Sequence, residues 1–168
     1  MNYRHHNKPK NDSQSSPITV ESVVEIPAKT STVFAFLANL ENNPLWNWAV
    51  TETRPLDGAP RTGSRYMQSH SSPKRSKGIL EITSYRDGEH LEVTSKVDAS
   101  VVLYRYDLSA TSDGGTRLVL AVDLHSVDRV SRPDLFSERL VSVLDMNLQN
   151  LRAAILQSEE PSTRSGVA

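Results

Sequence analysis

The chain has 168 residues, which suits one domain and is too short for two of ordinary size. Hydrophobic residues make up 37% of it and charged residues 23%, a balance that supports a globular core. The net charge of -1 excludes a strongly basic surface for nucleic acid or an anionic membrane, and the absence of cysteine excludes disulfides, thiolate zinc sites and cysteine nucleophiles.

The first residues are polar and have no apolar period, so we predict a disordered tail over residues 1–17. This segment has no apolar core of a secretory signal, and no run approaches the roughly 20 apolar residues that span a bilayer. We therefore expect a cytoplasmic protein whose structured domain covers residues 18–157. A second disordered tail is predicted over residues 158–168.

The structured part begins with a strand at Ile18–Ile26, where apolar and polar residues alternate. Pro27 ends it, and the period then changes to that of a helix over Thr30–Leu40, with apolar residues on one stripe. Two asparagines and a proline break this helix. Trp46 follows in a second short helical turn, where we expect it to plug one end of the space between sheet and helix.

Six further apolar alternations follow, separated by turns rich in Gly, Pro, Asp and Ser. Their short connections favour hairpins, and hence an antiparallel sheet. With the first strand they make seven. The predicted strands are Ala49–Leu56, Ser64–Ser71, Lys77–Arg86, Glu89–Val97, Ser100–Ala110 and Thr116–Ser126.

The last element is a long amphipathic helix predicted over about Asp134–Gln157. Its apolar residues recur every three or four positions. A helix of this size is roughly 36 Å long at 1.5 Å per residue, which is enough to cross a whole sheet. Because its polar face carries both signs of charge, we expect it to dock on the sheet rather than on a membrane.

Four local motifs carry a resemblance to a known family. They are Val23-Val-Glu-Ile-Pro-Ala28, Phe34-Ala-Phe-Leu-Ala-Asn39 followed by Asn43-Pro-Leu-Trp46, the stretch Val50–Tyr66 with Gly63-Ser64, and Gly114-Gly-Thr-Arg-Leu118. In this order they resemble the START-like helix-grip superfamily and, within it, the polyketide cyclase/dehydrase-like group of SRPBCC proteins. The resemblance covers about Ile18 to Leu156.

The resemblance implies an α+β helix-grip fold, in which a seven-stranded curved antiparallel sheet surrounds the C-terminal helix and two short helices follow the first strand. It also implies a cavity between sheet and helix. Members bind or transform hydrophobic molecules such as polyketides and lipids. Catalytic residues are not shared across the family, so the resemblance assigns none here.

Several side chains are candidates for lining such a cavity. Tyr104 and Tyr106 share the apolar face of their strand, where their hydroxyls either meet a ligand's polar groups or take part in ordinary core packing. In the strand Ser64–Ser71 the periodicity does not decide which face is inside. The predicted ligand-binding residues are Trp46, Tyr66, Gln68, His70, Tyr104, Tyr106, Leu120, Leu144 and Leu148.

Other polar groups give weaker signals. Asp123 and His125 share a face opposite the leucines of their strand, which favours a surface position over a catalytic or metal-binding pair. The basic patch Lys74-Arg75-Ser-Lys77 is typical of a solvated loop, with an anionic ligand or membrane surface as the alternatives. We find no metal-ligand spacing, nucleophile elbow or phosphate loop, and we expect no metal and no cofactor.

These observations favour binding of a small hydrophobic, lipid- or polyketide-like molecule without assigned chemistry. One alternative is a cyclase, aromatase or dehydratase in which the two tyrosines and His70 assist proton transfer. Another is a non-catalytic protein-interaction module with an exposed apolar patch around Trp46 and Trp48. We expect no nucleic-acid partner and no integral membrane association. The sequence leaves the oligomeric state open, with a homodimer as one alternative.

Overall fold

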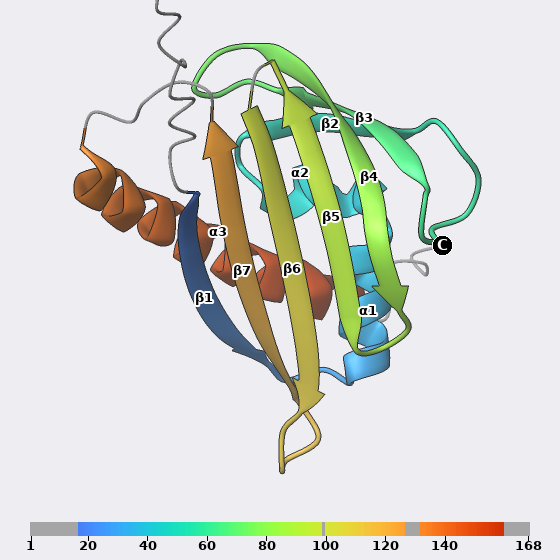
Figure 1. The fold of residues 1–168 in the computed structure, drawn as a ribbon. Coiled ribbons are helices and arrows are strands. Elements are labelled where there is room, and N and C mark those ends of the chain that lie inside the picture. Colours follow the sequence, from blue (N-terminus) through green and yellow to red (C-terminus); the bar gives the residue numbers. More distant parts are fainter. Residues whose placement is uncertain (1–16, 99, 127–131, 160–168) are drawn as a thin grey trace, which may run out of the picture.

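The structure, a computed structural model, describes residues 17–98, 100–126 and 132–159. Seven strands form one antiparallel sheet in the order β1-β7-β6-β5-β4-β3-β2 (Figure 1). Every neighbouring pair except β1 and β7 is consecutive in the chain, so short hairpins build most of the sheet. The predicted fold class, a helix-grip sheet with a long C-terminal helix, is confirmed.

The strands lie within one residue of their predicted bounds at each end. The alternation of apolar and polar residues predicted these bounds, and the turn residues between the strands end each strand. Most of the predicted tail 1–17 and most of the predicted tail 158–168 lie outside the described residues. The strands are β1 (Ile18–Ile26), β2 (Val50–Pro55), β3 (Arg65–His70), β4 (Ser76–Arg86), β5 (His90–Val97), β6 (Ser100–Ala110) and β7 (Thr116–Ser126).

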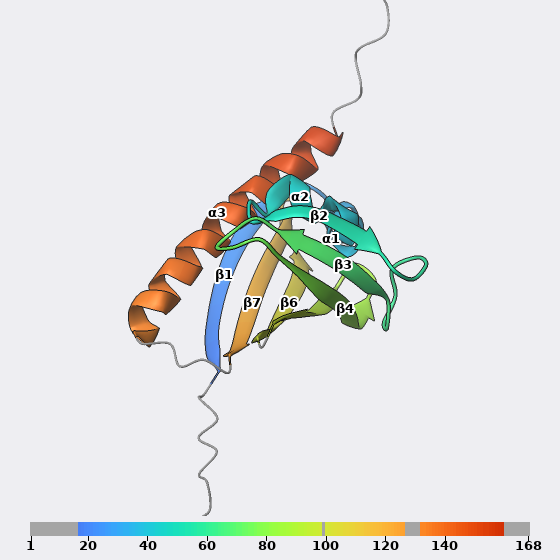
Figure 2. The ribbon, with the colours of Figure 1, turned by 90° about the horizontal axis from the view of Figure 1, so that it is seen from above.

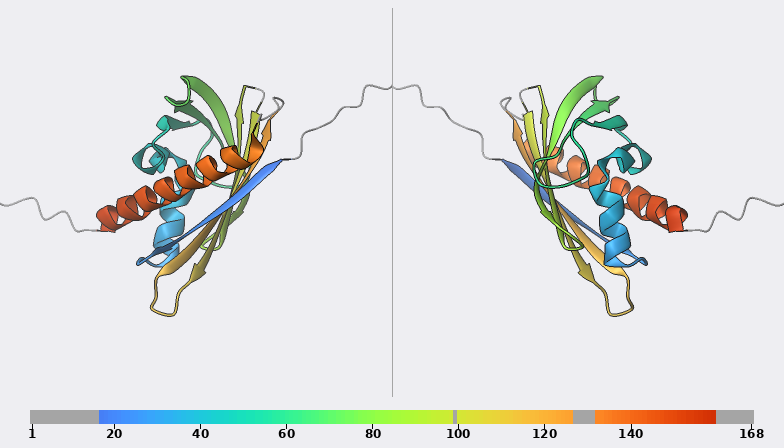
Figure 3. Two further views of the ribbon diagram at one scale, coloured as in Figure 1. Left: turned by 90° about the vertical axis from the view of Figure 1, so that its left-hand side faces the viewer. Right: turned by 90° about the vertical axis from the view of Figure 1, so that its right-hand side faces the viewer.

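The sheet is curved, and all helices lie on its concave side (Figures 2 and 3). Register shifts in β2, between Val50 and Glu52, and in β4, between Ile82 and Ser84, mark irregularities of the kind that bend strands. Side chains that point to the concave face are the buried ones. In β1, for example, Val20, Val24 and Ile26 are buried, as their shared face predicts.

The segment between β1 and β2 packs as three short helices. They are α1 (Thr30–Ala38), the 3-10 helix η1 (Leu40–Asn42) and α2 (Asn43–Trp46). The predicted helix Thr30–Leu40 thus ends two residues early, where Asn39 leaves helical geometry and its side chain accepts from the backbone of Glu41. The edge of the Phe34 ring meets Tyr85 of β4, with ring centroids 5.1 Å apart.

Helix α3 (Pro133–Glu159) is the longest element and crosses beside β1 (Figure 2). It extends slightly beyond the predicted span at both ends. Its buried side chains are Leu144, Asn147, Leu148, Leu151 and Ile155, and none lies before Leu144. The hydroxyl of Ser22 on β1 donates to Asp145, so the helix is also held to the sheet by a polar contact.

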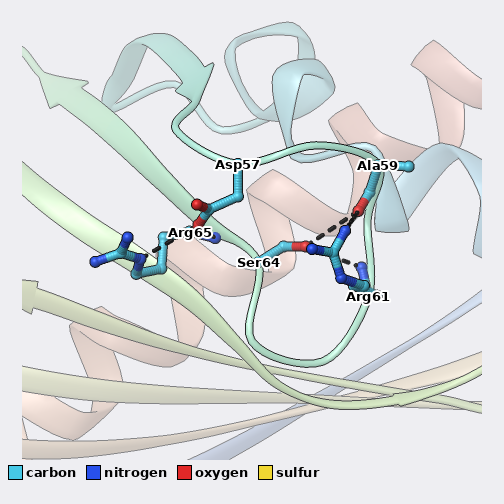
Figure 4. A network of polar contacts seen from close by, with 5 residues as sticks. All are labelled: Asp57, Ala59, Arg61, Ser64 and Arg65. Atoms are coloured by element: carbon cyan, nitrogen blue, oxygen red, sulfur yellow. Dashed lines mark hydrogen bonds and ion pairs between the residues drawn. The ribbon is translucent and has the colours of Figure 1, made fainter.

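A polar network shapes the loop between β2 and β3 (Figure 4). The buried hydroxyl of Ser64 donates to the carbonyl of Ala59 at 3.1 Å and accepts from the backbone N–H of Arg61 at 3.2 Å. Asp57 accepts from both the backbone and the side chain of Arg65, at 3.0 and 3.2 Å. These contacts lower the pKa of the Asp57 carboxyl, and they fix where β3 begins.

Gly78 of β4 provides a test of how closely the strands pack on the concave face. A Cβ atom at this position would lie 2.8 Å from the carbonyl oxygen of Lys96 and would collide with the side chain of Val97. We expect Gly78→Ala to lower the free energy of unfolding by about 1–3 kcal/mol in urea denaturation. Gly58→Ala is the matched control, because its nearest atom would be the Arg61 guanidinium at 3.8 Å. Equal stability of the two variants would contradict this packing.

Candidate functional site

A small cavity of about 20 Å³ lies between the concave face of the sheet and the short helices, and we call it the interior cavity. Strands β3 to β6 form one wall, and η1, α2 and the residue after it form the other. Its volume is about that of a single enclosed water. The lining residues are Leu40, Asn43, Trp46, Asn47, Gln68, Leu80, Val93, Tyr104 and Tyr106.

Polar groups from three separate elements converge on this cavity. The Nε1 atom of Trp46 is buried and has no hydrogen-bond partner among the described residues. Gln68 is buried and donates through Nε2 to the hydroxyl of Thr53 at 3.1 Å. Tyr104 and Tyr106 of β6 line the cavity as well. An unpaired buried N–H costs about 1–3 kcal/mol, so a water or a ligand acceptor beside Trp46 is strongly favoured.

The tyrosine hydroxyls remain protonated at neutral pH. Burial raises the pKa of Tyr104, and burial together with the neighbouring Tyr104 raises the pKa of Tyr106 far above its ordinary value. Both side chains therefore act as neutral groups that donate one hydrogen bond and accept others. Together with Trp46 and Gln68, they suit a carbonyl or hydroxyl group on an otherwise apolar molecule.

Side chains on the concave face of the sheet are less deeply buried toward one end of the sheet. We call this the rim end: here β3, β5 and β7 end, and β4 and β6 begin. On the concave face of β6, Tyr106 and Leu108 are buried, whereas Val102 and Tyr104, nearer the rim end, are half-buried. The first turns of α3, Pro133–Val143, likewise have no buried side chain, and Leu140 and Val141 pack only partly against the core. This half of the interface offers accessible apolar surface next to the polar groups.

The structure brings together four of the nine predicted binding residues, Trp46, Gln68, Tyr104 and Tyr106, in the interior cavity. Tyr66 is buried on the same face of β3 as Gln68, and burial raises the pKa of its hydroxyl. Leu120, Leu144 and Leu148 are buried in the core that continues from this cavity. Their contact with a ligand stays a prediction.

Sequence reasoning did not single out five further lining residues: Leu40, Asn43, Asn47, Leu80 and Val93. Only Asn43 carried a signal, because it begins the Asn43-Pro-Leu-Trp46 motif. The two tryptophans do not form one exposed patch, since Trp46 is 5% exposed and Trp48 is 49% exposed. Trp46 is held in place where its carbonyl accepts from Asn150 of α3 at 3.4 Å.

His70 lies apart from the interior cavity. It lines an open pocket of about 500 Å³ at the rim end, which we call the rim pocket, together with Thr51, Ser69, Ser71, Arg75, Ser76 and Lys77. Burial lowers the pKa of His70, and its Nδ1 atom is buried without a hydrogen-bond partner among the described residues. The sequence did not predict this pocket, although the basic patch Lys74-Arg75-Ser-Lys77 lies in the turn that borders it.

The remaining polar candidates lie on the convex face. Asp123 accepts from Arg105 at 2.7 Å and from the hydroxyl of Thr19 at 2.7 Å, and His125 is exposed, as predicted. Within the described ranges, no group of three or more His, Cys, Asp or Glu residues is arranged to hold a metal ion. No helix in this part of the chain is both long and apolar enough to cross a membrane.

Comparison with known proteins gave one family and several solved structures. The sequence profile of the family "Polyketide cyclase / dehydrase and lipid transport" matches residues 17–155. A search of curated proteins gave no match.

Three solved structures show the same fold at low sequence identity. TTHA0849 of Thermus thermophilus superposes with a TM-score of 0.72 at 16% identity, over 84% of this chain and 99% of that one. A START superfamily protein from Mycobacterium smegmatis gives 0.70 at 17% identity, over 83% and 98%. Ara h 8.0201 gives 0.65 at 14% identity, over 83% and 97%.

Proposed function

The chain belongs to the polyketide cyclase / dehydrase and lipid transport family, and we propose that it binds a small, mostly hydrophobic molecule between its sheet and α3. The family description covers both lipid transport and reactions on polyketides. The choice between binding and catalysis therefore rests on the residues of this chain.

One observation carries the proposal: Trp46, whose buried N–H has no partner among the described residues, lines a single small cavity together with Gln68, Tyr104 and Tyr106. Ordinary cores pair their buried donors, so a donor without a partner is a ready contact for a ligand's oxygen. The polar end of the ligand fits this position. Its apolar body fits along the half-buried side chains Val102, Leu140 and Val141 toward the rim end.

The interior cavity, at about 20 Å³, is too small to hold a metabolite. Sites for such ligands usually measure about 300–1,000 Å³. Binding therefore requires the cavity to expand, and we propose that it expands toward the rim end, where the first turns of α3 cover the sheet. The first turns of the helix, Pro133–Val143, are suited to this, since none of their side chains is buried, whereas Leu144, Leu148, Leu151 and Ile155 anchor the rest. We propose that these first turns of α3 swing outward around the anchored part.

The residues around the interior cavity support binding more strongly than catalysis. Tyr104 and Tyr106, both protonated, resemble proton donors that a cyclase or dehydratase needs. A reaction of that kind also needs a base, and none of the nine residues around the cavity is a carboxylate or a histidine. His70, which we considered as a proton-transfer group, lines the rim pocket instead.

Titration with the neutral fluorescent probe N-phenyl-1-naphthylamine tests the proposal. We expect saturable binding of one probe per chain, with a blue-shifted emission that an excess of an apolar competitor reverses. Trp46→Phe should weaken the probe's affinity several-fold, because it changes the wall of the cavity. Trp48→Phe is the matched control and should bind as the unmodified chain does, since this side chain is 49% exposed. A probe signal that does not saturate would contradict the proposal.

A further inference from the structure

The rim pocket differs from the interior cavity in both position and chemistry. It lies where the turn between β3 and β4 meets the start of β2, on the edge strand of the sheet. Its volume of about 500 Å³ is ample for a small ligand. An ion pair of 2.9 Å between Lys74 and Asp98 links this turn to the turn between β5 and β6. The pocket therefore borders a turn that is held to its neighbour at the rim end.

The side chains that line the rim pocket are nearly all donors of hydrogen bonds. Four hydroxyl residues, two cationic side chains and one imidazole surround it, and there is no carboxylate among them. No ion pair joins Arg75 or Lys77 to another described residue. The acidic residue on the adjacent strand, Glu52, is held by Arg54 at 2.6 Å. The pocket therefore presents positive charge that no neighbouring carboxylate neutralises.

From this arrangement we propose that the rim pocket binds an oxyanion, which is the phosphate, sulfate or carboxylate group of a small molecule. The guanidinium of Arg75 matches two oxygens of such a group, and Lys77 adds a point charge beside it. Ser69 and Ser76 line the same pocket and supply hydroxyl donors, whereas the hydroxyls of Thr51 and Ser71 donate to the carbonyls of Ser69 and Ala49. This site does not depend on the proposed function of the interior cavity.

His70 gives a second, independent reason. His70 lines the same pocket, and its buried Nδ1 atom has no hydrogen-bond partner in the described part of the chain. Because burial lowers the pKa of His70, the ring is neutral at neutral pH and carries a single N–H. In the tautomer protonated at Nδ1, the ring donates to an oxygen of the bound anion and so satisfies a group that the fold leaves unpaired.

The test is an NMR titration of the full chain with inorganic phosphate, with sodium chloride used to match the ionic strength. We expect saturable shifts of the backbone amides at residues 69–77 that chloride does not produce. The double variant Arg75→Gln/Lys77→Gln should weaken phosphate binding about fivefold or more, the loss of two exposed ion pairs. Lys74→Gln is the matched control: it removes a charge from the same turn, but Lys74 is paired with Asp98 and does not line the pocket.

A second titration compares dodecyl phosphate with inorganic phosphate to identify the source of the anion. Tighter binding of dodecyl phosphate that the double variant abolishes would assign the site to the head group of an amphipathic ligand. Equal binding of both would assign it to free oxyanions, and either result supports the proposal. Absence of phosphate-specific shifts, an equal loss in Lys74→Gln, or binding to anionic vesicles without binding to phosphate would overturn it.

Discussion

Replacing Leu148 with alanine is expected to lower the free energy of unfolding by about 2–5 kcal/mol, as for other fully buried leucines. Leu148 is 1% exposed and lies in the half of α3 that packs on the core. The decrease in the free energy of unfolding has two parts: the apolar contacts that are removed, and the cavity that remains because the surrounding strands do not close over it. Urea denaturation monitored by circular dichroism would measure it.

Leu140→Ala is the matched control in the same helix. Leu140 is only partly buried and lies in the first half of α3, so its loss should cost clearly less, about 1 kcal/mol. The difference between the two variants measures how unevenly α3 is attached. Equal losses would contradict loosely held first turns before an anchored remainder of α3, and with it the proposed route of ligand entry.

The double variant Tyr104→Phe/Tyr106→Phe is expected to separate binding from stability. Removing two hydroxyls that line the interior cavity should weaken binding of 1-naphthol about tenfold, while binding of naphthalene should change little. Stability should stay the same or rise slightly, because phenylalanine keeps the aromatic ring in the core and removes only a hydroxyl. Competition against N-phenyl-1-naphthylamine gives both affinities.

Tyr85→Phe serves as the control for this experiment. Tyr85 is a half-buried tyrosine on β4 that packs against Phe34 and does not line the cavity. It should leave the preference for 1-naphthol over naphthalene unchanged. If the double variant retains that preference, the hydroxyls of β6 do not contact the ligand's polar group.

Much of the fold could be predicted because local patterns specify it. Alternation in Ile18–Ile26 marks β1 and its buried face, and Gly114, with a φ of +85°, marks a tight turn. The end of α1 was harder to predict. The apolar stripe continues to Leu40, but Asn39 breaks the helix before that residue and moves Leu40 into η1.

Strand β3 shows where local pattern is insufficient. Tyr66, Gln68 and His70 share one face, and that face mixes aromatic and polar residues, so its alternation does not show which side is buried. Position in the sheet decides, because β3 lies beside β4 and its inward side meets the helices: Tyr66 and Gln68 are buried and Met67 is exposed. The apolar Met67 on the outer face is the residue that makes the pattern ambiguous.

The site itself depends on distances across the chain that periodicity does not contain. Trp46, Gln68 and Tyr104 are far apart in sequence and meet only because β3 and β6 curve toward α2. The size of the interior cavity depends on how residues such as Leu80 and Val93 fill the space. Thr51 of the rim pocket likewise lies at the irregular register of β2, which no pattern in the sequence predicts.

Native mass spectrometry of the freshly purified chain, compared with its denatured mass, tests most directly whether a small hydrophobic molecule binds between the sheet and α3. We predict either a copurified species heavier by one small molecule or, for an empty chain, a one-to-one adduct when a hydrophobic compound is added. The Tyr104→Phe/Tyr106→Phe variant should bind 1-naphthol more weakly, so its adduct should dissociate at a lower collision energy than that of the unmodified chain. A native mass equal to the denatured mass, both alone and with added hydrophobic compounds, would contradict the proposed binding.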